Sequence, residues 1–202
     1  MHEQRRHQRI RFSTPPKLDL GFGGALGVGE IENLSQAGLM VRTSLPLQPG
    51  RLAGCEFSLF GSPLIDVPAT VVSCIGDLVS MRFQIGPISQ VVIEDAIAAA
   101  LAGGQASTLV VHERGGRKVM RLSGGLNGTL RNDFMHALTR VGVDEIDVAA
   151  VTAVDQGGIA LCLVANSRHG VAIGAQSACF AEAWAQALTN PAHADNPPRG
   201  MQ

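Results

Sequence analysis

The spacing of apolar residues changes near residue 104, and this change limits the possible folds more than any other property of the chain. Before it, short runs of alternating apolar and polar residues are separated by Gly and Pro, as at Pro15-Pro16 and Gly23-Gly24. Beyond it, apolar runs alternate with segments of helical spacing. Alternation is typical of half-buried strands, and helical spacing of amphipathic helices. We therefore expect two domains of different class within the 202 residues.

The first half has the pattern of a small antiparallel barrel or roll. A hairpin is predicted from Val67–Ile75 and Leu78–Phe83, with its turn at Gly76-Asp77. Pro87 opens a predicted helix that runs to Leu101, since proline is tolerated in the first turn of a helix. The apolar stripe predicted for this helix consists of Ile88, Val92, Ala96 and Ala99.

Two polar segments in this half are candidates for a ligand site. The first is a basic N-terminal arm, which we expect to be mobile without a ligand and to favour an anion. Its arginines are Arg5, Arg6, Arg9 and Arg11. The second is Asn33-Leu34-Ser35-Gln36-Ala37-Gly38, which follows a strand predicted for Ala25–Glu32 and is predicted to form a corner. Each has an ordinary explanation by itself, the first as a solvated tail and the second as a turn.

Together, the two segments resemble the PilZ domain, which binds the bacterial second messenger cyclic di-GMP. In that family an Arg-x-x-x-Arg arm precedes an Asn/Asp-x-Ser-x-x-Gly motif. The matching residues here are Arg5 and Arg9 in the arm, and Asn33, Ser35 and Gly38 in the motif. The resemblance covers about residues 3–101 and implies an all-β, six-stranded antiparallel barrel with a C-terminal helix in a domain of residues 1–103. It also implies that these five residues bind cyclic di-GMP, with Arg6 and Arg11 in support.

The chemistry of the ligand agrees with these residue types. Cyclic di-GMP has two phosphates and two guanines, and an arginine fork can bond either a phosphate or the O6/N7 edge of a guanine. Asn33 offers a donor and an acceptor to the Watson–Crick edge. The Ser35 hydroxyl can reach a phosphate or a guanine, and Gly38 lets the backbone approach closely. We expect binding to order residues 3–12, and this ordering is the switch that we expect.

The second half has the pattern of an α/β domain whose sheet is covered by helices. A flexible linker is expected at residues 102–107. The predicted strands are 108–111, 118–122, 145–154 and 171–173. The predicted helices are 129–140, 158–170 with Asp155 as its cap, and one that Ser177 caps. The strand 145–154 is so apolar that we expect it to be covered on both faces. The inward side chains expected in the second helix are Ala160, Leu163 and Val164.

This order of elements, with Ala153-Val154-Asp155-Gln156-Gly157-Gly158 leading into a helix, resembles a STAS domain over about residues 108–189. The resemblance implies a protein-interaction domain whose partner surface includes Asp155, Gln156 and Gly157. Regulated STAS domains carry a phosphorylatable Ser or Thr where this chain has Gln156. An amide cannot accept phosphate, so we do not expect kinase control at this position. The remaining residues, 190–202, are expected to be disordered.

Other functional classes find no support in the sequence. Composition is 46% apolar and 16% charged, with a net charge of −1, which gives no reason to expect nucleic acid or a membrane surface as a partner. No apolar run is long enough to span a membrane. The histidines are scattered, so no metal and no cofactor are expected. Cys55, Cys74, Cys162 and Cys179 form no Cys-x-x-Cys pair, and no signal peptide is recognised, so we expect a cytoplasmic protein with structural thiols.

The expected function is that of a bacterial cyclic di-GMP receptor or adaptor that passes the signal to a partner protein through the STAS-like domain. The alternative is a constitutive STAS-type antagonist or scaffold, in which the barrel is only a docking module. An enzyme is the weakest hypothesis, because no catalytic constellation is present. The sequence leaves open whether one or two ligand molecules bind, and which process is regulated.

Overall fold

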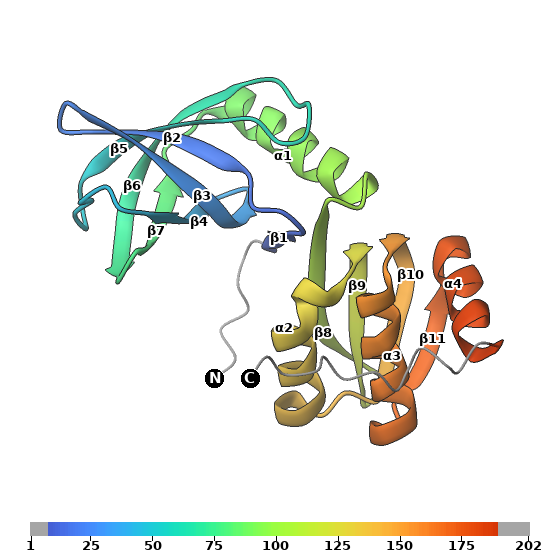
Figure 1. Cartoon of the computed structure of the whole chain (residues 1–202). Coiled ribbons are helices and arrows are strands. Elements are labelled where there is room, and N and C mark those ends of the chain that lie inside the picture. The colour runs from blue at the N-terminus through green and yellow to red at the C-terminus, as the bar shows by residue number, and fades with distance from the viewer. Residues whose placement is uncertain (1–7, 190–202) are drawn as a thin grey trace, which may run out of the picture. The chain divides into compact units, whose positions relative to one another are not determined.

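The computed structural model describes residues 8–189 and divides into two compact units, residues 1–108 and 109–202 (Figure 1). Arg5 and Arg6 of the basic arm, and the tail 190–202, lie outside the described residues. Each unit has its own core of buried apolar side chains.

The N-terminal unit contains a closed, six-stranded antiparallel barrel, as predicted. Its strands follow each other around the barrel in the order β3-β2-β5-β6-β7-β4, and pairing of β3 with β4 closes it. They are β2 (Lys17–Phe22), β3 (Ala25–Ser35), β4 (Gly38–Thr43), β5 (Leu52–Phe57), β6 (Ile65–Ile75) and β7 (Leu78–Phe83). The predicted hairpin is confirmed as β6 and β7, which pair from Ile75↔Leu78 onward. Closure leaves the barrel without an unpaired edge.

Strict alternation fills the barrel interior. In β5, Ala53, Cys55 and Phe57 are buried, while the residues between them are exposed. Successive side chains of a strand point to opposite faces, so this pattern places one face in the core and the other in solvent. Phe57 also stacks on Phe83 of β7, with ring centroids 6.4 Å apart. Burial of these side chains stabilises the barrel by roughly 1.5–3 kcal/mol for each large apolar residue.

Helix α1 (Pro87–Ala102) lies beside β6 and begins at the predicted proline (Figure 1). Its predicted apolar stripe is confirmed only in part, since Ala96 is buried and Val92 packs against the core while Ala99 is exposed. The buried residues are Ile93, Ala96 and Ala100, whereas Ile88 is 83% exposed. Apolar side chains occur on nearly every side of this helix, so its sequence gives little contrast between an inner and an outer face. Packing against the barrel selects the face instead.

The predicted flexible linker is also wrong, because residues 102–107 are built into the fold. Ala102 ends α1, and the Gln105 N–H donates to the Ala100 carbonyl at 3.0 Å. Ala106 and Ser107 begin strand β8 (Ala106–Arg114), where both are buried. They pair with β1 (Ile10–Phe12), in the register Phe12↔Ala106. Backbone pairing therefore fixes a segment whose composition alone is typical of a linker.

The C-terminal unit is an α/β unit whose strands lie in the order β8-β9-β10-β11. Strand β10 is parallel to β9 and to β11, which requires helical crossovers between them. The elements after β8 are β9 (Arg117–Leu126), η1 (Gly128–Leu130), α2 (Arg131–His136), η2 (Ala137–Val141), β10 (Glu145–Val154), α3 (Gln156–His169), β11 (Ala172–Gln176) and α4 (Ala178–Thr189). Strands and helices thus alternate in the order that the sequence predicted.

Two packing predictions for this unit need correction. Ala149 and Ala150 of β10 are exposed, so this strand is not covered on both faces. The polar face of β10 carries Asp147, which forms an ion pair with Arg121 of β9 at 3.1 Å. In α3 the fully buried apolar residues are Ile159, Leu161, Cys162 and Ala165. Of the predicted three, Leu163 is partly buried against the core and Ala160 is exposed. The helix has small or apolar residues on most sides, and its sequence therefore does not identify the buried face.

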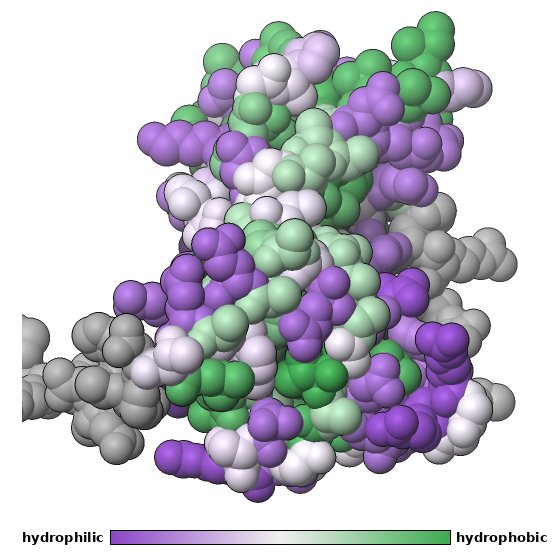
Figure 2. Space-filling view, turned by 90° about the vertical axis from the view of Figure 1, so that its right-hand side faces the viewer, coloured by the Kyte–Doolittle hydropathy of each residue, from purple (hydrophilic) through white to green (hydrophobic). Residues whose placement is uncertain are grey.

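Helix α4 carries apolar side chains on both sides. Its inner side includes Phe180, which is fully buried and stacks on Trp184 with ring centroids 5.6 Å apart. The outer side exposes Ala178, Ala181, Ala185 and Leu188. Figure 2 looks at the side of the molecule where α4 lies, and apolar groups there are interleaved with hydrophilic ones. Ser177 caps the helix as predicted, because its hydroxyl accepts from the Phe180 N–H at 3.4 Å.

Burial sets the chemistry of two cysteines. Cys55 lies in the barrel core and Cys162 in the core of the second unit, and desolvation raises the pKa of each thiol to about 12. Both therefore stay protonated at neutral pH, as expected for structural thiols. Within residues 8–189, none of the helices has the length and apolar character needed to cross a bilayer.

Candidate ligand-binding site

The segment Asn33–Gly38 is the end of a hairpin rather than the predicted corner after a strand. Strand β3 continues through Ser35, the turn consists of Gln36 and Ala37, and β4 starts at Gly38. The Ser35 hydroxyl donates to the Gly38 carbonyl at 3.1 Å and so ties the two strand ends together. Asn is a frequent turn residue, and the sequence therefore placed the end of the strand three residues early.

Gly38 is required by its packing against a neighbouring strand. It pairs with Arg82 of β7, and a Cβ at this position would lie 2.1 Å from the Met81 carbonyl oxygen. No side chain fits there unless the β7 backbone moves. In the described structure this glycine permits a close approach of β4 to β7. The expected approach of a ligand to Gly38 stays a prediction.

We predict that Gly38→Ala destabilises the protein by about 1–3 kcal/mol or more, because the added methyl group must displace backbone rather than a flexible side chain. Denaturant unfolding of the full chain measures this. Gly54→Ala is the matched control, since a Cβ at Gly54 of β5 would meet nothing within 4 Å. A Gly38 variant as stable as the Gly54 variant would contradict the packing argument.

Strand β1 brings the described end of the arm, which contains Arg11, to this hairpin. It pairs antiparallel with β3 in the register Ile10↔Leu34 and Arg11↔Asn33. Ile10 is 1% exposed and Phe12 6%, so burial of these two side chains anchors the strand. Residues 10–12 are thus already part of a strand, which corrects the expectation that the whole arm is mobile. Arg9 directly precedes β1 and therefore lies near the end of β3 that contains Ser35.

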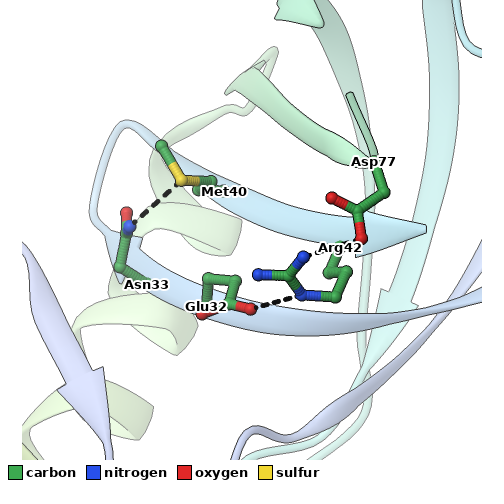
Figure 3. Close-up of polar contacts among 5 residues, drawn as sticks. All are labelled: Glu32, Asn33, Met40, Arg42 and Asp77. Atoms are coloured by element: carbon green, nitrogen blue, oxygen red, sulfur yellow. Dashed lines mark hydrogen bonds and ion pairs between the residues drawn. The ribbon is translucent and has the colours of Figure 1, made fainter. Parts of the chain in front are cut away.

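Asn33 combines burial with an unused acceptor. The residue is 7% exposed, and its Nδ2 contacts the Met40 sulfur at 3.6 Å, as Figure 3 shows. Within residues 8–189, its Oδ1 is buried and has no hydrogen-bond partner. A buried acceptor without a donor costs roughly 1–3 kcal/mol, and natural structures usually avoid it. A site that carries this cost can recover it when a ligand or another group supplies an N–H.

An ion-pair network holds the strands next to Asn33. The Arg42 guanidinium of β4 contacts Asp77 at 2.7 Å and Glu32 of β3 at 2.9 Å (Figure 3). The hydrogen bond to Asp77, and then the one to Glu32, raise the pKa of Arg42 above its ordinary value. The guanidinium is exposed, so the network adds little stability. It links Glu32, the residue before Asn33, to β4.

Comparison with known families assigns the N-terminal unit. The family model of the PilZ domain matches residues 3–102. These residues are a PilZ domain. The match includes Arg5 and Arg9 as well as Asn33, Ser35 and Gly38. Comparison with curated protein sequences gave no match.

Solved structures of PilZ proteins are similar to the chain at low sequence identity. The PilZ domain of CeSA from a cellulose-synthesizing bacterium is 21% identical, with 45% of this chain and 96% of that chain covered and a TM-score of 0.38. The PilZ domain of YcgR from Escherichia coli, solved with cyclic di-GMP, is 17% identical, with 48% and 95% covered and a TM-score of 0.41. PlzA of Borreliella burgdorferi, in complex with cyclic di-GMP, is 20% identical, with a TM-score of 0.35. The alignment covers 46% of this chain and 41% of PlzA.

The second set of predicted site residues lies at the start of α3. The Asp155 carboxylate accepts from the Gly158 N–H at 2.7 Å and caps the helix, as predicted. Gln156 is exposed, whereas a Cβ at Gly157 would lie 3.0 Å from the backbone of Gly128. Gly157 is therefore fixed by close packing, whereas Gln156, like Asp155, is exposed to solvent. Over residues 8–189, side chains of His, Cys, Asp and Glu form no cluster of three that could hold a metal.

Proposed function

We propose that this protein is a cyclic di-GMP receptor that binds the messenger at the β3–β4 hairpin and signals to a partner protein through its C-terminal unit. The ligand would contact Arg9, Asn33 and Ser35, with Arg5 as the second arginine of the arm. Arg6 and Arg11 would add supporting charge. Gly38 would shape the hairpin. The PilZ assignment of residues 3–102 supports the ligand class.

The observation that carries the proposal is the buried Oδ1 of Asn33. This acceptor has no partner within the described residues, and guanine carries two N–H groups on its Watson–Crick edge that can donate to it. The register Arg11↔Asn33 supports the role of the arm, because it brings the backbone of the arm alongside the same asparagine. An arginine there could stack on a guanine or bond a phosphate.

The C-terminal unit is the proposed output module. The resemblance of its order of strands and helices to a STAS domain supports this role, and the proposed partner surface is Asp155, Gln156 and Gly157 at the start of α3. Gln156 has no hydroxyl for a kinase, so the messenger rather than phosphorylation would control the partner. Strand β1 pairs with the first residues of β8, and β8 continues into this unit. Ordering of the arm would therefore act on β8, the strand at which the second unit begins.

Titration calorimetry of the full chain with two dinucleotides tests the ligand. Cyclic di-GMP and cyclic di-AMP have the same phosphates and differ only in their bases. We expect cyclic di-GMP to bind about 100-fold more tightly, since one lost bidentate guanine contact costs roughly 1–3 kcal/mol and two guanines are read. Equal affinities, or no binding of either, would contradict the proposal.

The constitutive scaffold is the second candidate, because a PilZ barrel can serve as a docking module whether or not it holds a ligand. Pull-down of bacterial lysate with the immobilised full chain, with and without cyclic di-GMP, separates the two. Recovery of a partner that depends on the ligand supports the receptor. Recovery that is indifferent to the ligand, from a protein that binds cyclic di-GMP in the calorimeter, favours the scaffold.

A further inference from the structure

Three carboxylates form a row across strands β2, β5 and β6 on the outer face of the barrel. The row lies level with Val28 of β3, away from the hairpin that carries Asn33. Asp19 of β2 pairs directly with Glu56 of β5, and Glu56 pairs directly with Asp66 of β6. All three side chains are exposed, and within residues 8–189 none of them forms an ion pair. Like charges directly opposite each other on neighbouring strands are destabilising.

The neighbouring row on the same face is built differently. Lys17 of β2 pairs with Glu30 of β3, and Glu30 pairs with Arg42 of β4, so the charges alternate. Arg42 also bonds Glu32 and Asp77. This row compensates its charges within the barrel, whereas the carboxylate row does not. The carboxylate row therefore carries a cost in the free protein that a cationic partner would remove.

The carboxylate row has an apolar margin and a hollow beside it. Asp19 pairs on its other side with Val28 of β3, which is 58% exposed, and Leu26 is 89% exposed. Gly21 and Gly54 occupy the next positions on β2 and β5, so no side chains fill the space there. The resulting hollow, which these residues line together with the carboxylates, has a volume of about 550 Å³. A surface with this combination suits an amphipathic partner better than a bare ion.

We propose that this face of the barrel, defined by Leu26, Val28 and the three carboxylates, docks a basic amphipathic helix of a partner protein. The carboxylates are spaced by the distance between strands, about 4.8 Å, so the row spans about 10 Å. Basic residues at i, i+4 and i+7 of a helix span about the same length on one face. The helix lies across the strands, its cations meet the row, and an apolar residue beside them packs on Leu26 and Val28. This docking site goes beyond the receptor function and does not require cyclic di-GMP.

The test uses the full chain and a peptide of ~18 residues, which is long enough to form a helix when it binds a surface. The peptide has Leu and Ala on one side and Lys at i, i+4 and i+7 beside them, and a scrambled peptide of equal composition distributes the Lys around the helix. Fluorescence anisotropy should show about 10-fold tighter binding of the ordered peptide, a preference that D19N/E56Q/D66N abolishes. The same variant should melt at or above the temperature of the wild type, because charge repulsion is removed.

The control variant D95N/E113Q/E182Q removes three exposed carboxylates elsewhere and changes the net charge equally. It should keep the preference for the ordered peptide. Loss of the preference in the control as well, or no preference in the wild type, would overturn the proposal. A concentration-dependent dimer of the wild type that D19N/E56Q/D66N abolishes, measured by sedimentation, would overturn it too, because the occupant would then be a second copy of the chain.

Discussion

Replacing Arg9 with alanine is expected to weaken binding of cyclic di-GMP by about 100-fold or more. The guanidinium can bond a phosphate or a guanine edge bidentately, which is worth roughly 1–3 kcal/mol, and stacking on a base adds roughly 0.5–2 kcal/mol. Arg9 directly precedes β1, whose pairing with β3 places Arg11 beside Asn33. Titration calorimetry of the full chain measures the loss.

Two further variants separate the paired hydrogen-bond donors of the Arg9 guanidinium from its positive charge. Arg9→Lys keeps the positive charge but loses the planar donor pair, so we expect an intermediate affinity. Arg114→Ala removes an exposed arginine at the far end of β8 and should bind as the wild type does. If the Arg9→Ala variant binds cyclic di-GMP as tightly as the Arg114→Ala variant does, Arg9 is not part of the binding site.

The second large effect is expected at Asn33. Asn33→Leu keeps the size of the side chain but removes the acceptor that guanine would use, so affinity should fall by about 10- to 100-fold. The free protein should not lose stability, because the substitution also removes a buried oxygen that has no partner within residues 8–189. Calorimetry and denaturant unfolding of the same preparation give both quantities.

Thr43→Val is the matched control for Asn33→Leu. Thr43 is also a buried polar residue of the barrel, but its hydroxyl donates to the Val28 carbonyl at 3.0 Å and accepts from the Leu45 N–H at 3.2 Å. Its loss should destabilise the protein by about 1–2 kcal/mol and leave ligand affinity unchanged. The two variants should thus show opposite patterns. If Asn33→Leu destabilises as Thr43→Val does and still binds, Asn33 is a structural residue.

The sequence was sufficient wherever local pattern decides the structure. Alternation of apolar residues predicted the barrel strands, and capping residues such as Ser177 and Asp155 predicted where helices begin. Local pattern failed for α1 and α3, where small apolar residues occupy nearly all sides and the core chooses the face. Alanine occurs both in cores and at surfaces, so it does not distinguish the buried face of a helix from the exposed one.

Long-range pairing accounts for the rest of the site. The role of Gly38 depends on Met81, more than forty residues away in sequence, and no local signal reveals that contact. The pairing of β1 with β3 is also non-local, as is the capture of Ala106 and Ser107 by β1. The motif residues themselves were visible in the sequence, but their arrangement depends on which strands the barrel brings together.

A crystal structure of the full chain with cyclic di-GMP tests the central claim most directly. We expect a guanine N–H within about 3 Å of Asn33 Oδ1, with the Arg9 guanidinium bonded to or stacked on the same ligand molecule. A bound ligand that leaves Asn33 Oδ1 without a donor, and that Arg9 does not touch, would contradict it.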